Sequence, residues 1–493
     1  MFPLVSITLF VPLAGAALLA FMRGSPPRLA HAVGIGSSGL ALLGSLVMWA
    51  RGAAGGGFSQ VEEVAWIPSL GAAYRVGVDG ISLPLVLMTT ILFFVSLVFS
   101  AHVSERASSY VALFLMLETA SLGVFVALDA VLFYVFFEVT LVGMYFIIAG
   151  WGYEDRQRAA LTFFLYTLLG SLPLLLAILA LYLGSEPNTF DMRAYIDSPP
   201  LSGLAAVLAL IAMLVTFFVK TPVFPVHTWL PLAHTEAPTA GSVILAGVLL
   251  KLGTYGLVRF ALQMTPDAFR ALAPVVVAFG VISALYGAFV ALAQTDLKRL
   301  VAYTSVNHMG YVVVGVGVAA AATAPGTDPA TLALALDGAT LQMVSHGVVT
   351  GALFLLVGML QERAHTREMG AFGGLLRSVP TLGWAFVLAA FASLGLPGLA
   401  HFPAEFQVFL GTFYVYPVAA VVVLGLVVTA GLYLRAIQVA FLGEPKGRWA
   451  GMKDLTRREV LAAAPLLALT IALGVVPFVV LDVVHATTRG LLP

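Results

Sequence analysis

The sequence predicts an all-α polytopic membrane protein with about 14 transmembrane helices, and three observations lead to this fold class. Sixty per cent of the 493 residues are hydrophobic and only 10% are charged, whereas a soluble domain is about 25% charged. Apolar runs of the length that crosses a bilayer, about 20 helical residues, recur along the whole chain. The runs are continuous, whereas a membrane β-barrel requires alternating polar and apolar positions.

Short polar or Pro- and Gly-containing breaks divide the apolar sequence into spans. The predicted spans are residues 3–22, 29–50, 78–101, 108–127, 130–150, 159–184, 203–221, 239–262, 270–293, 299–320, 332–360, 379–398, 416–442 and 459–483. The longest aqueous segments, 51–77, 185–202 and 443–458, are too short to form a soluble domain. We therefore expect residues 1–493 to form a single membrane domain. Arg23 follows the first apolar run instead of preceding it, so this run is expected to be a retained helix and not a secretory signal.

The distribution of Lys and Arg predicts the orientation, because cytoplasmic loops are enriched in these residues. Loops that follow odd-numbered spans hold sixteen: Arg23, Arg28, Arg106, Arg156, Arg158, Lys298, Arg299, Arg363, Arg367, Arg377, Arg435, Lys446, Arg448, Lys453, Arg457 and Arg458. Even-numbered loops and the C-terminus hold six: Arg51, Arg75, Arg193, Arg259, Arg270 and Arg489. The odd loops are therefore predicted to be cytoplasmic and both termini to lie outside. Only Lys220 and Lys251 remain, and both fall inside spans.

Composition also excludes several kinds of chemistry. The chain has no cysteine, so it can form no disulfide, thiolate zinc site or cysteine-ligated iron–sulfur cluster. Its formal net charge of +0 leaves no basic excess that would hold nucleic acid. We expect no cofactor in this chain.

Titratable side chains inside the spans are the candidates for function, because a charge at the bilayer centre costs at least ~2.5–3.5 kcal/mol. There are seven: Glu118, Glu138, Lys220, Lys251, His308, His346 and Glu405. Salt bridges that only fix helix packing are the alternative interpretation, although Ser, Thr or Asn would meet that need at lower cost. Two histidines without a nearby carboxylate or cysteine pattern do not predict a metal site. Bis-histidine haem ligation by His308 and His346 stays open at this point.

Two of these charges lie beside predicted helix breaks. Lys220 precedes Pro222 and Pro225, and Glu405 follows Pro397 and Pro403. Each break is followed by an apolar stretch that is too short to span, 223–234 and 402–412. Proline removes a helical hydrogen bond, and broken helices at membrane depth are typical of transport pathways. The sequence therefore predicts that helices 7 and 12 are broken.

The positions of the breaks also indicate an internal repeat. The two broken helices are five apart, and the Glu138 to Tyr145 segment of the fifth span parallels Asn307 to Tyr311 of the tenth. Five helices is an odd number, so two such units must insert in opposite orientations. We expect inverted repeats over 108–262 (helices 4–8) and 270–442 (helices 9–13).

Specific motifs support a family resemblance over about residues 75–445. They are Val78-Asp79-Gly80-Ile81-Ser82-Leu83, Phe137-Glu138 with Met144-Tyr145-Phe146, Val219-Lys220-Thr221-Pro222, His227 with Trp229, Pro231 and His234, Ala237 to Val243, Leu250-Lys251, Tyr303 with Ser305 and His308-Met309-Gly310, and Ser345-His346-Gly347. With these motifs the chain resembles the antiporter-like membrane subunits of respiratory complex I and the related multisubunit cation/proton antiporters.

Within this family, the glutamate at position 405 makes the chain resemble the M-type branch of NADH–quinone oxidoreductase. Most other branches carry lysine at this place on the broken twelfth helix. The length of the chain and the absence of a long lateral helix after the last predicted span agree with that branch. Two positions depart from the pattern. Leu232 stands where many relatives have Asp, which leaves the cytoplasmic mouth with one acid fewer, and Gly143 stands where many have Pro.

The resemblance implies proton translocation driven by quinone reduction elsewhere in a complex. From the residues themselves we expect Glu138 and Lys220, which have opposite charge and lie in spans five and seven of one repeat, to form a switchable charged pair. Lys251 is then expected to accept the proton, His308 and His346 to relay it, and Glu405 to release it. Glu118, His227 and His234 are secondary candidates. L-type and N-type membrane subunits, lipid, and a peripheral dehydrogenase arm with FMN and iron–sulfur clusters are the implied partners, in a bacterial inner membrane. A sodium/proton antiporter subunit and a non-pumping structural scaffold are the alternatives.

Overall fold

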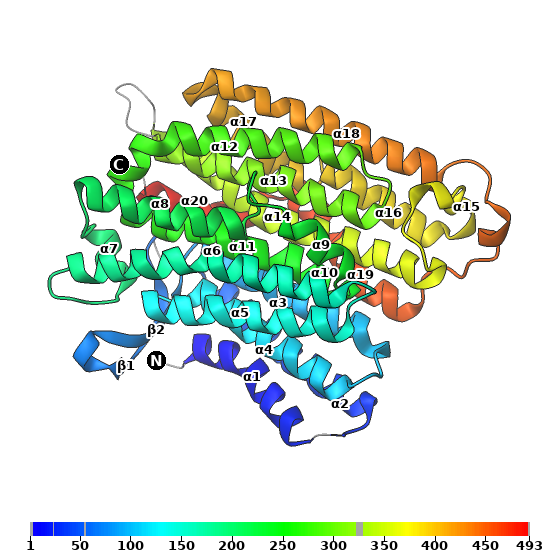
Figure 1. Ribbon diagram of the computed structural model, residues 1–493, viewed down its shortest axis with the longest axis horizontal. Helices are drawn as coiled ribbons and strands as arrows, with labels where there is room; N and C mark the ends of the chain where they lie inside the picture. Colours follow the sequence, from blue (N-terminus) through cyan, green and yellow to red (C-terminus); the bar gives the residue numbers. More distant parts are fainter. Residues whose placement is uncertain (1–2, 23, 54–55, 322–328, 492–493) are drawn as a thin grey trace.

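The computed structural model describes residues 3–22, 24–53, 56–321 and 329–491, so Arg23 lies outside the described residues. Its helices lie side by side along the long axis of the molecule, with α1 and α2 at one edge and α18 near the other (Figure 1). The start of α1 and the end of α20 lie at the same end of the bundle, together with the two strands and α7 (Figure 1). We call this the terminal end.

The helices of the first half begin and end close to the predicted breaks. They are α1 (Leu4–Phe21), α2 (Pro27–Arg51), α3 (Ser82–Phe99), α4 (Ala107–Val126), α5 (Ala130–Trp151), α6 (Arg156–Gly184), α7 (Met192–Asp197), α8 (Gly203–Lys220), α9 (Trp229–Glu236), α10 (Thr239–Ile244) and α11 (Leu250–Gly256). π-Helical turns η3 (Leu245–Leu249) and η4 (Leu257–Leu262) flank α11, so that 239–262 is one continuous span.

The second half has the same character. Its helices are α12 (Pro266–Leu292), α13 (Leu297–Ala320), α14 (Pro329–Ala364), α15 (Leu375–Ser378), α16 (Pro380–Ser393), α17 (His401–Val415), α18 (Leu424–Ala436), α19 (Arg457–Val475) and α20 (Phe478–Leu491). α18 is extended by helical turns at both ends, η6 (Pro417–Val423) and η7 (Ile437–Phe441). α13 and α14 are buried and pack against each other at the centre of the bundle.

Among the described residues, twelve helices are long and apolar enough to cross a membrane. The mostly helical polytopic fold class is therefore confirmed. The tenth and twelfth predicted spans correspond to α13 and α16, which are not among these twelve. The count of fourteen stays a prediction.

Both predicted helix breaks are present. α8 ends at Lys220 and α9 begins only at Trp229. α16 ends at Ser393 and α17 begins at His401. Each of the two intramembrane charges therefore lies within about two turns of a free helix end, where backbone groups are left without helical partners.

A β-hairpin adds a small non-helical element that the sequence reading of 51–77 as an aqueous segment did not include. β1 (Ser59–Ile67) pairs antiparallel with β2 (Ala72–Val78). Arg75 on β2 donates to Glu63 at 2.7 Å and to Asp129 at 3.0 Å, which fastens the hairpin to the start of α5. The hydrogen bond from Arg75 holds the pKa of the Glu63 carboxyl below its usual range.

Two details of the sequence prediction are wrong. The last span does not run to residue 483, because α19 ends at Val475 and Pro477 separates it from the terminal helix α20. Arg259 and Arg435 are not loop residues: Arg259 lies in η4 with 1% exposure and forms an ion pair with Asp79, and Arg435 lies in the last turn of α18. A buried guanidinium is tolerated at this position because a carboxylate neutralises it. Without Arg259 and Arg435, the odd-numbered loops still hold 15 basic residues (16 − 1), and the even-numbered loops with the C-terminus hold 5 (6 − 1).

Candidate functional site

Lys251 lies at the centre of the bundle, between the two π-helical turns. Its side chain is completely buried, and its Nζ donates to the carbonyl of Ala246 at 2.5 Å and contacts Nδ1 of His346 at 2.6 Å. A π-turn shifts the backbone pairing by one residue and often marks a functional site. Here the turn η3 includes Ala246, whose carbonyl accepts from the lysine.

His346 continues from Lys251 toward two further histidines. Its Nδ1 faces Lys251, and its Nε2 is buried without a hydrogen-bond partner among the described residues. Its ring centre lies 5.6 Å from that of His308 and 6.1 Å from that of His401. Buried polar atoms are rarely left unpaired without a functional reason. Three imidazoles from α14, α13 and α17 thus form one buried cluster.

Glu405 lies on the far side of this cluster from Lys251. Its Oε1 is 3.1 Å from Nδ1 of His308, and it accepts from Nε2 of Gln342 at 3.2 Å. Nδ1 of His401 lies 3.7 Å from the same oxygen. Oε2 of Glu405 is buried without a partner among the described residues. The carboxylate is therefore partly satisfied and retains one free oxygen inside the protein.

The helix break makes room for this carboxylate. Gly395 adopts a φ of +77°, which favours glycine, and a Cβ at this position would lie 2.7 Å from Oε2 of Glu405. The backbone turn and the missing side chain are both needed. The break thus lets α17 present Glu405 to α13 and α14.

Four of the predicted residues, Lys251, His346, His308 and Glu405, are therefore brought together. We call them, with His401, the buried line. His401 was missed by the sequence prediction, because the stretch 402–412 was judged too short to span and the histidine just before it was not considered. The spacing of His401 and Glu405, four residues apart on one helix face, is the signal that would have found it. Gln342 and Ser393, which hydrogen-bond Glu405 and His308, were missed as well.

Glu138 and Lys220 are not in contact. Lys220 is 2% exposed, its Nζ donates to Thr140 at 3.3 Å, and it lies 4.8 Å from the ring centre of Phe137. Glu138 lies between these two residues on α5 but is only partly buried, and among the described residues no ion pair joins it to Lys220. The two charges interact through space at longer range. The predicted direct pair is absent from this arrangement.

Lys220 is nevertheless next to the helix that carries Lys251. A Cβ built on Gly253 would lie 3.0 Å from Cβ of Lys220 and 2.4 Å from Oγ1 of Thr221. The missing side chain at Gly253 thus lets α11 approach the end of α8. A movement of the chain at the first break would therefore act on α11 at Gly253, two residues from Lys251.

The secondary candidates lie outside the buried line. Glu118 on α4 is fully buried, and its Oε1 accepts from Ser38 of α2 at 2.9 Å. His234 on α9 stacks on Phe354 at 4.5 Å, and both of its ring nitrogens are unpaired among the described atoms. His227 lies in the first break with its ring 5.0 Å from Tyr286. None of the three is hydrogen-bonded to a residue of the line.

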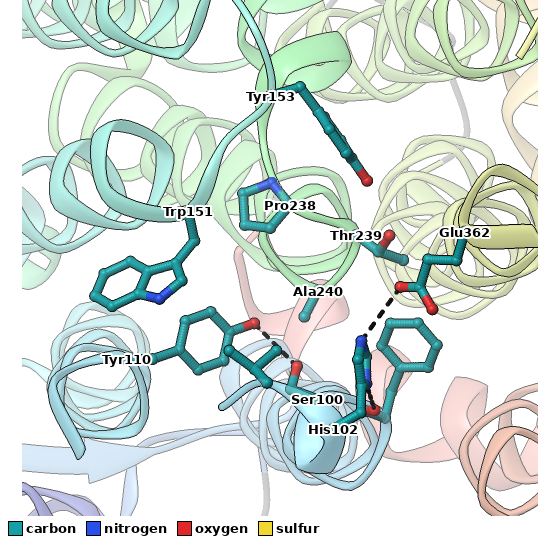
Figure 2. A pocket seen from close by; sticks show the side chains of 11 residues that line it. Ser100, His102, Tyr110, Trp151, Tyr153, Pro238, Thr239, Ala240 and Glu362 are labelled. Carbon is teal, nitrogen blue, oxygen red and sulfur yellow. Dashed lines mark hydrogen bonds and ion pairs between the residues drawn. The ribbon is translucent and has the colours of Figure 1, made fainter. Parts of the chain in front are cut away.

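A pocket of about 400 Å³ opens at the end of the bundle opposite the terminal end. Figure 2 shows His102 and Glu362 next to each other on one side of it, with Nε2 of His102 3.5 Å from the carboxylate. Tyr110, which hydrogen-bonds Ser100 at 2.9 Å, and Trp151 line its other wall (Figure 2). Thr239, at the start of the span that carries Lys251, also lines the pocket. An opening lined by both apolar and polar side chains therefore lies at the start of that span.

The contacts of the buried histidines also bear on whether they could ligate a haem or a metal ion. Both nitrogens of His308 and one of His346 already have hydrogen-bond partners, which leaves bis-histidine haem ligation without support. His308, His401 and Glu405 offer three ligand atoms within 4.8 Å of one another, a set that could hold a cation. In the observed arrangement, however, His308 and Glu405 are hydrogen-bonded to each other.

The fold and the buried line together define an antiporter-like polytopic membrane protein. The chain belongs to the family described as NADH:quinone oxidoreductase/Mrp antiporter, whose pattern matches residues 127–432, more than half of the chain.

Individual relatives narrow this further. The chain is 42% identical to NADH-quinone oxidoreductase subunit M of Rhodobacter capsulatus, over 99% of this chain and 96% of the relative. It is 36% identical to NAD(P)H-quinone oxidoreductase chain 4 2 of Thermosynechococcus vestitus, over 99% of this chain and 92% of the relative. The resemblance to the M-type branch is confirmed by these matches.

Solved structures agree. A chain of respiratory complex I from Thermus thermophilus superposes with a TM-score of 0.88 at 32% identity, covering 99% of this chain and all of that one (100%). A chain of the Mrp complex from Dietzia sp. superposes with a TM-score of 0.85 over 100% of this chain and 98% of that one. The latter is only 23% identical, so it shows a shared fold alone.

Proposed function

We propose that this chain is the M-type membrane subunit of a bacterial NADH–quinone oxidoreductase and that it translocates protons when quinone is reduced elsewhere in the complex. The observation that carries the proposal is the buried line from Lys251 through His346, His308 and His401 to Glu405. Every member of this line can accept and release a proton. The burial of so many titratable groups in one series of neighbouring side chains is costly unless it serves transport.

The proposed transfer starts at Lys251. Its contact with Nδ1 of His346 allows a proton to move from the ammonium to the imidazole, whose ring centre lies 5.6 Å from that of His308 and 6.1 Å from that of His401. An imidazole accepts on one nitrogen and releases from the other. His308, 3.1 Å from Glu405, then delivers the proton to the carboxylate.

The first break supplies the switch in this proposal. In the observed arrangement Lys220 lacks a contacting carboxylate, and approach of Glu138 would favour its ammonium form. Retreat of Glu138 would favour release of the Lys220 proton toward α11, which packs directly against Lys220 at Gly253. The pocket beside His102 and Glu362 is the proposed uptake mouth.

We further propose the setting of this subunit. The inverted repeats 108–262 and 270–442 would each supply one broken helix to a common midplane. The positive-inside distribution supports both termini outside a bacterial inner membrane. Because the chain has no cysteine, FMN and iron–sulfur chemistry would belong to partner subunits, with L-type and N-type subunits and lipid as its membrane neighbours.

The test uses the assembled complex in sealed vesicles, with quinone-reductase turnover and proton uptake measured together. Glu405→Gln and Lys251→Met should each lower proton translocation by about 10²-fold, as expected for removal of a positioned proton-transfer group. Glu118→Gln is the matched control, because it removes an equally buried carboxyl group outside the line.

Two results would reject the proposal in favour of its alternatives. Purification without flavin- and iron–sulfur-bearing subunits, combined with sodium/proton exchange in vesicles, would identify an antiporter subunit. Normal pumping by assembled complexes that carry Glu405→Gln or Lys251→Met would leave a structural scaffold.

A further inference from the structure

A second titratable pair lies at the terminal end of the bundle, outside the buried line. Asp337, near the start of α14, is 4% exposed, and its Oδ2 lies 2.5 Å from Nδ1 of His485 on the terminal helix α20. Its Oδ1 accepts from Thr488, also on α20. The His485 side chain is 37% exposed. The pair therefore has one buried member and one member open to solvent.

Attachment of α20 does not by itself require this pair. Val480 and Val484 of α20 are buried in the apolar core, and Thr487 accepts from the backbone N–H of Gly80 at 2.9 Å. A carboxylate buried inside an apolar span is costly, and an apolar residue would fasten α20 at lower cost. The aspartate thus has chemistry that the packing of α20 does not need.

Asp337 is also close to Glu405. Asp337 and Gln342 are on the same helix, five residues or about 7.5 Å of rise apart, and Gln342 donates to Glu405. Beside Asp337, a Cβ at Gly338 would lie 2.7 Å from the carbonyl of Ala404, the residue that precedes Glu405. α14 and α17 are therefore in direct backbone contact between the two carboxylates.

We propose that Asp337 and His485 form a proton-release relay between Glu405 and the aqueous phase at the terminal end. This inference rests on the proposed proton-translocating function. Water carries the proton from the carboxyl group of Glu405 to Asp337. The carboxylic acid then gives its proton to Nδ1 of His485, and the imidazolium releases a proton from Nε2 to solvent. No bond other than those to the proton changes, and the histidine returns to its neutral form.

The charged neighbours of the pair are few. Arg489, one turn beyond His485, is a cation that acts on Asp337, and its charge favours the carboxylate after release. α17, which carries Glu405, packs against α14. α20 thereby has a role beyond covering the end of α14, since it supplies the imidazole that connects a buried acid to water.

The experiment compares His485→Ala, Asp337→Asn and Thr488→Val in the assembled complex in sealed vesicles. His485→Ala and Asp337→Asn should each lower proton translocation about tenfold, less than a typical acid–base group because water partly replaces the ring. Thr488→Val is the control: it removes the other hydrogen bond to Asp337 but leaves both titratable groups, so pumping should stay close to that of the unaltered chain.

Imidazole provides a measurement that a merely structural role would not move. Added to the compartment that faces the terminal end, it should restore pumping to His485→Ala, because the vacated position is open to solvent. Normal pumping by assembled His485→Ala, or a loss that imidazole does not restore, would overturn the relay. His485→Ala also keeps the test possible if Asp337→Asn fails to assemble.

The same vesicles distinguish failure of the relay from failure of the proposed function. If Glu405→Gln stops pumping but His485→Ala does not, only the relay is wrong. If Glu405→Gln pumps normally, proton translocation by this chain is wrong and the relay with it.

Discussion

The two broken helices carry opposite charges in very different surroundings. At the first break, Lys220 is buried with one weak hydrogen bond, to Thr140 at 3.3 Å, and with the face of Phe137. At the second break, Glu405 contacts His308 and Gln342 within hydrogen-bond distance and has His401 beside it. One charge is isolated and the other is part of a network.

This difference assigns different tasks to the two breaks. An isolated buried charge responds strongly to the approach of a counter-ion, because little else stabilises it. A carboxylate in a polar network responds less to any single neighbour, since several groups share its stabilisation. In the proposed mechanism, Lys220 at the first break therefore changes its protonation state when Glu138 moves. Glu405 at the second break holds the proton before it is released. Variants at the two breaks should consequently differ in how their effects combine.

Lys220→Met should have the largest effect of the variants that test this comparison. It removes the isolated charge and puts an unbranched apolar side chain of similar length in its place. Proton translocation should fall by about 10²-fold or more while the complex still assembles, because the switched proton is lost without loss of packing. Turnover and proton uptake in sealed vesicles, with assembly checked by native gel, measure the result.

Glu138 sharpens that prediction through a double-mutant cycle. Glu138→Gln alone should also stall pumping, and Glu138→Asp should preserve much of it, since the carboxylate remains. In the double variant Glu138→Gln with Lys220→Met, the loss should barely exceed that of Lys220→Met, because both changes disable one coupled element. Independent, additive losses would show that the two charges do not act together, and Glu138 would then be a packing residue.

His401→Gln should have an intermediate effect and tests the network at the second break. His308 is hydrogen-bonded to both Glu405 and Ser393, whereas Nε2 of His401 is unpaired among the described atoms. We expect His401→Gln to lower pumping several-fold and His308→Gln to lower it more. His308 is hydrogen-bonded to Glu405, whereas His401 provides a second route to the same carboxylate. Equal losses in the two variants would contradict a network with two branches. The measurement is initial proton uptake per quinone reduced.

The elements of the fold that the sequence predicted are those that depend on local pattern. Long apolar runs define the spans, and the prolines beside Lys220 and Glu405 locate both breaks, since proline acts on its own helix wherever that helix packs. The β-hairpin was not predicted because its strands lie in a short segment that looked merely polar. α20 was merged with the preceding span because the apolar residues continue across Pro477.

The candidate site was predictable in its members but not in its contacts. Lys251, His308, His346 and Glu405 stand out in the sequence because titratable groups are rare in apolar spans. Which of them touch depends on helix rotation and side-chain direction, which no local pattern encodes. Glu138 and Lys220 were therefore paired because of their opposite charge and their places in one repeat, although the structure does not bring them into contact. Arg259 was placed in a loop because its partner, Asp79, lies 180 residues away in sequence.

Glu118→Gln should have the smallest effect, and it tests whether burial alone makes a carboxyl group important. Glu118 is as buried as Glu405, but its contact is with Ser38 on α2, at the edge of the bundle that holds α1 and α2 (Figure 1). Glutamine has the same shape and can still accept from Ser38 through its carbonyl oxygen. Proton translocation and turnover should therefore stay within about twofold of the unaltered complex, as a cost of under ~0.5 kcal/mol would give. A loss as large as that of Glu405→Gln would place Glu118 on a second proton path through α2 and α4, and the contrast between the two breaks would then describe only part of the transport machinery.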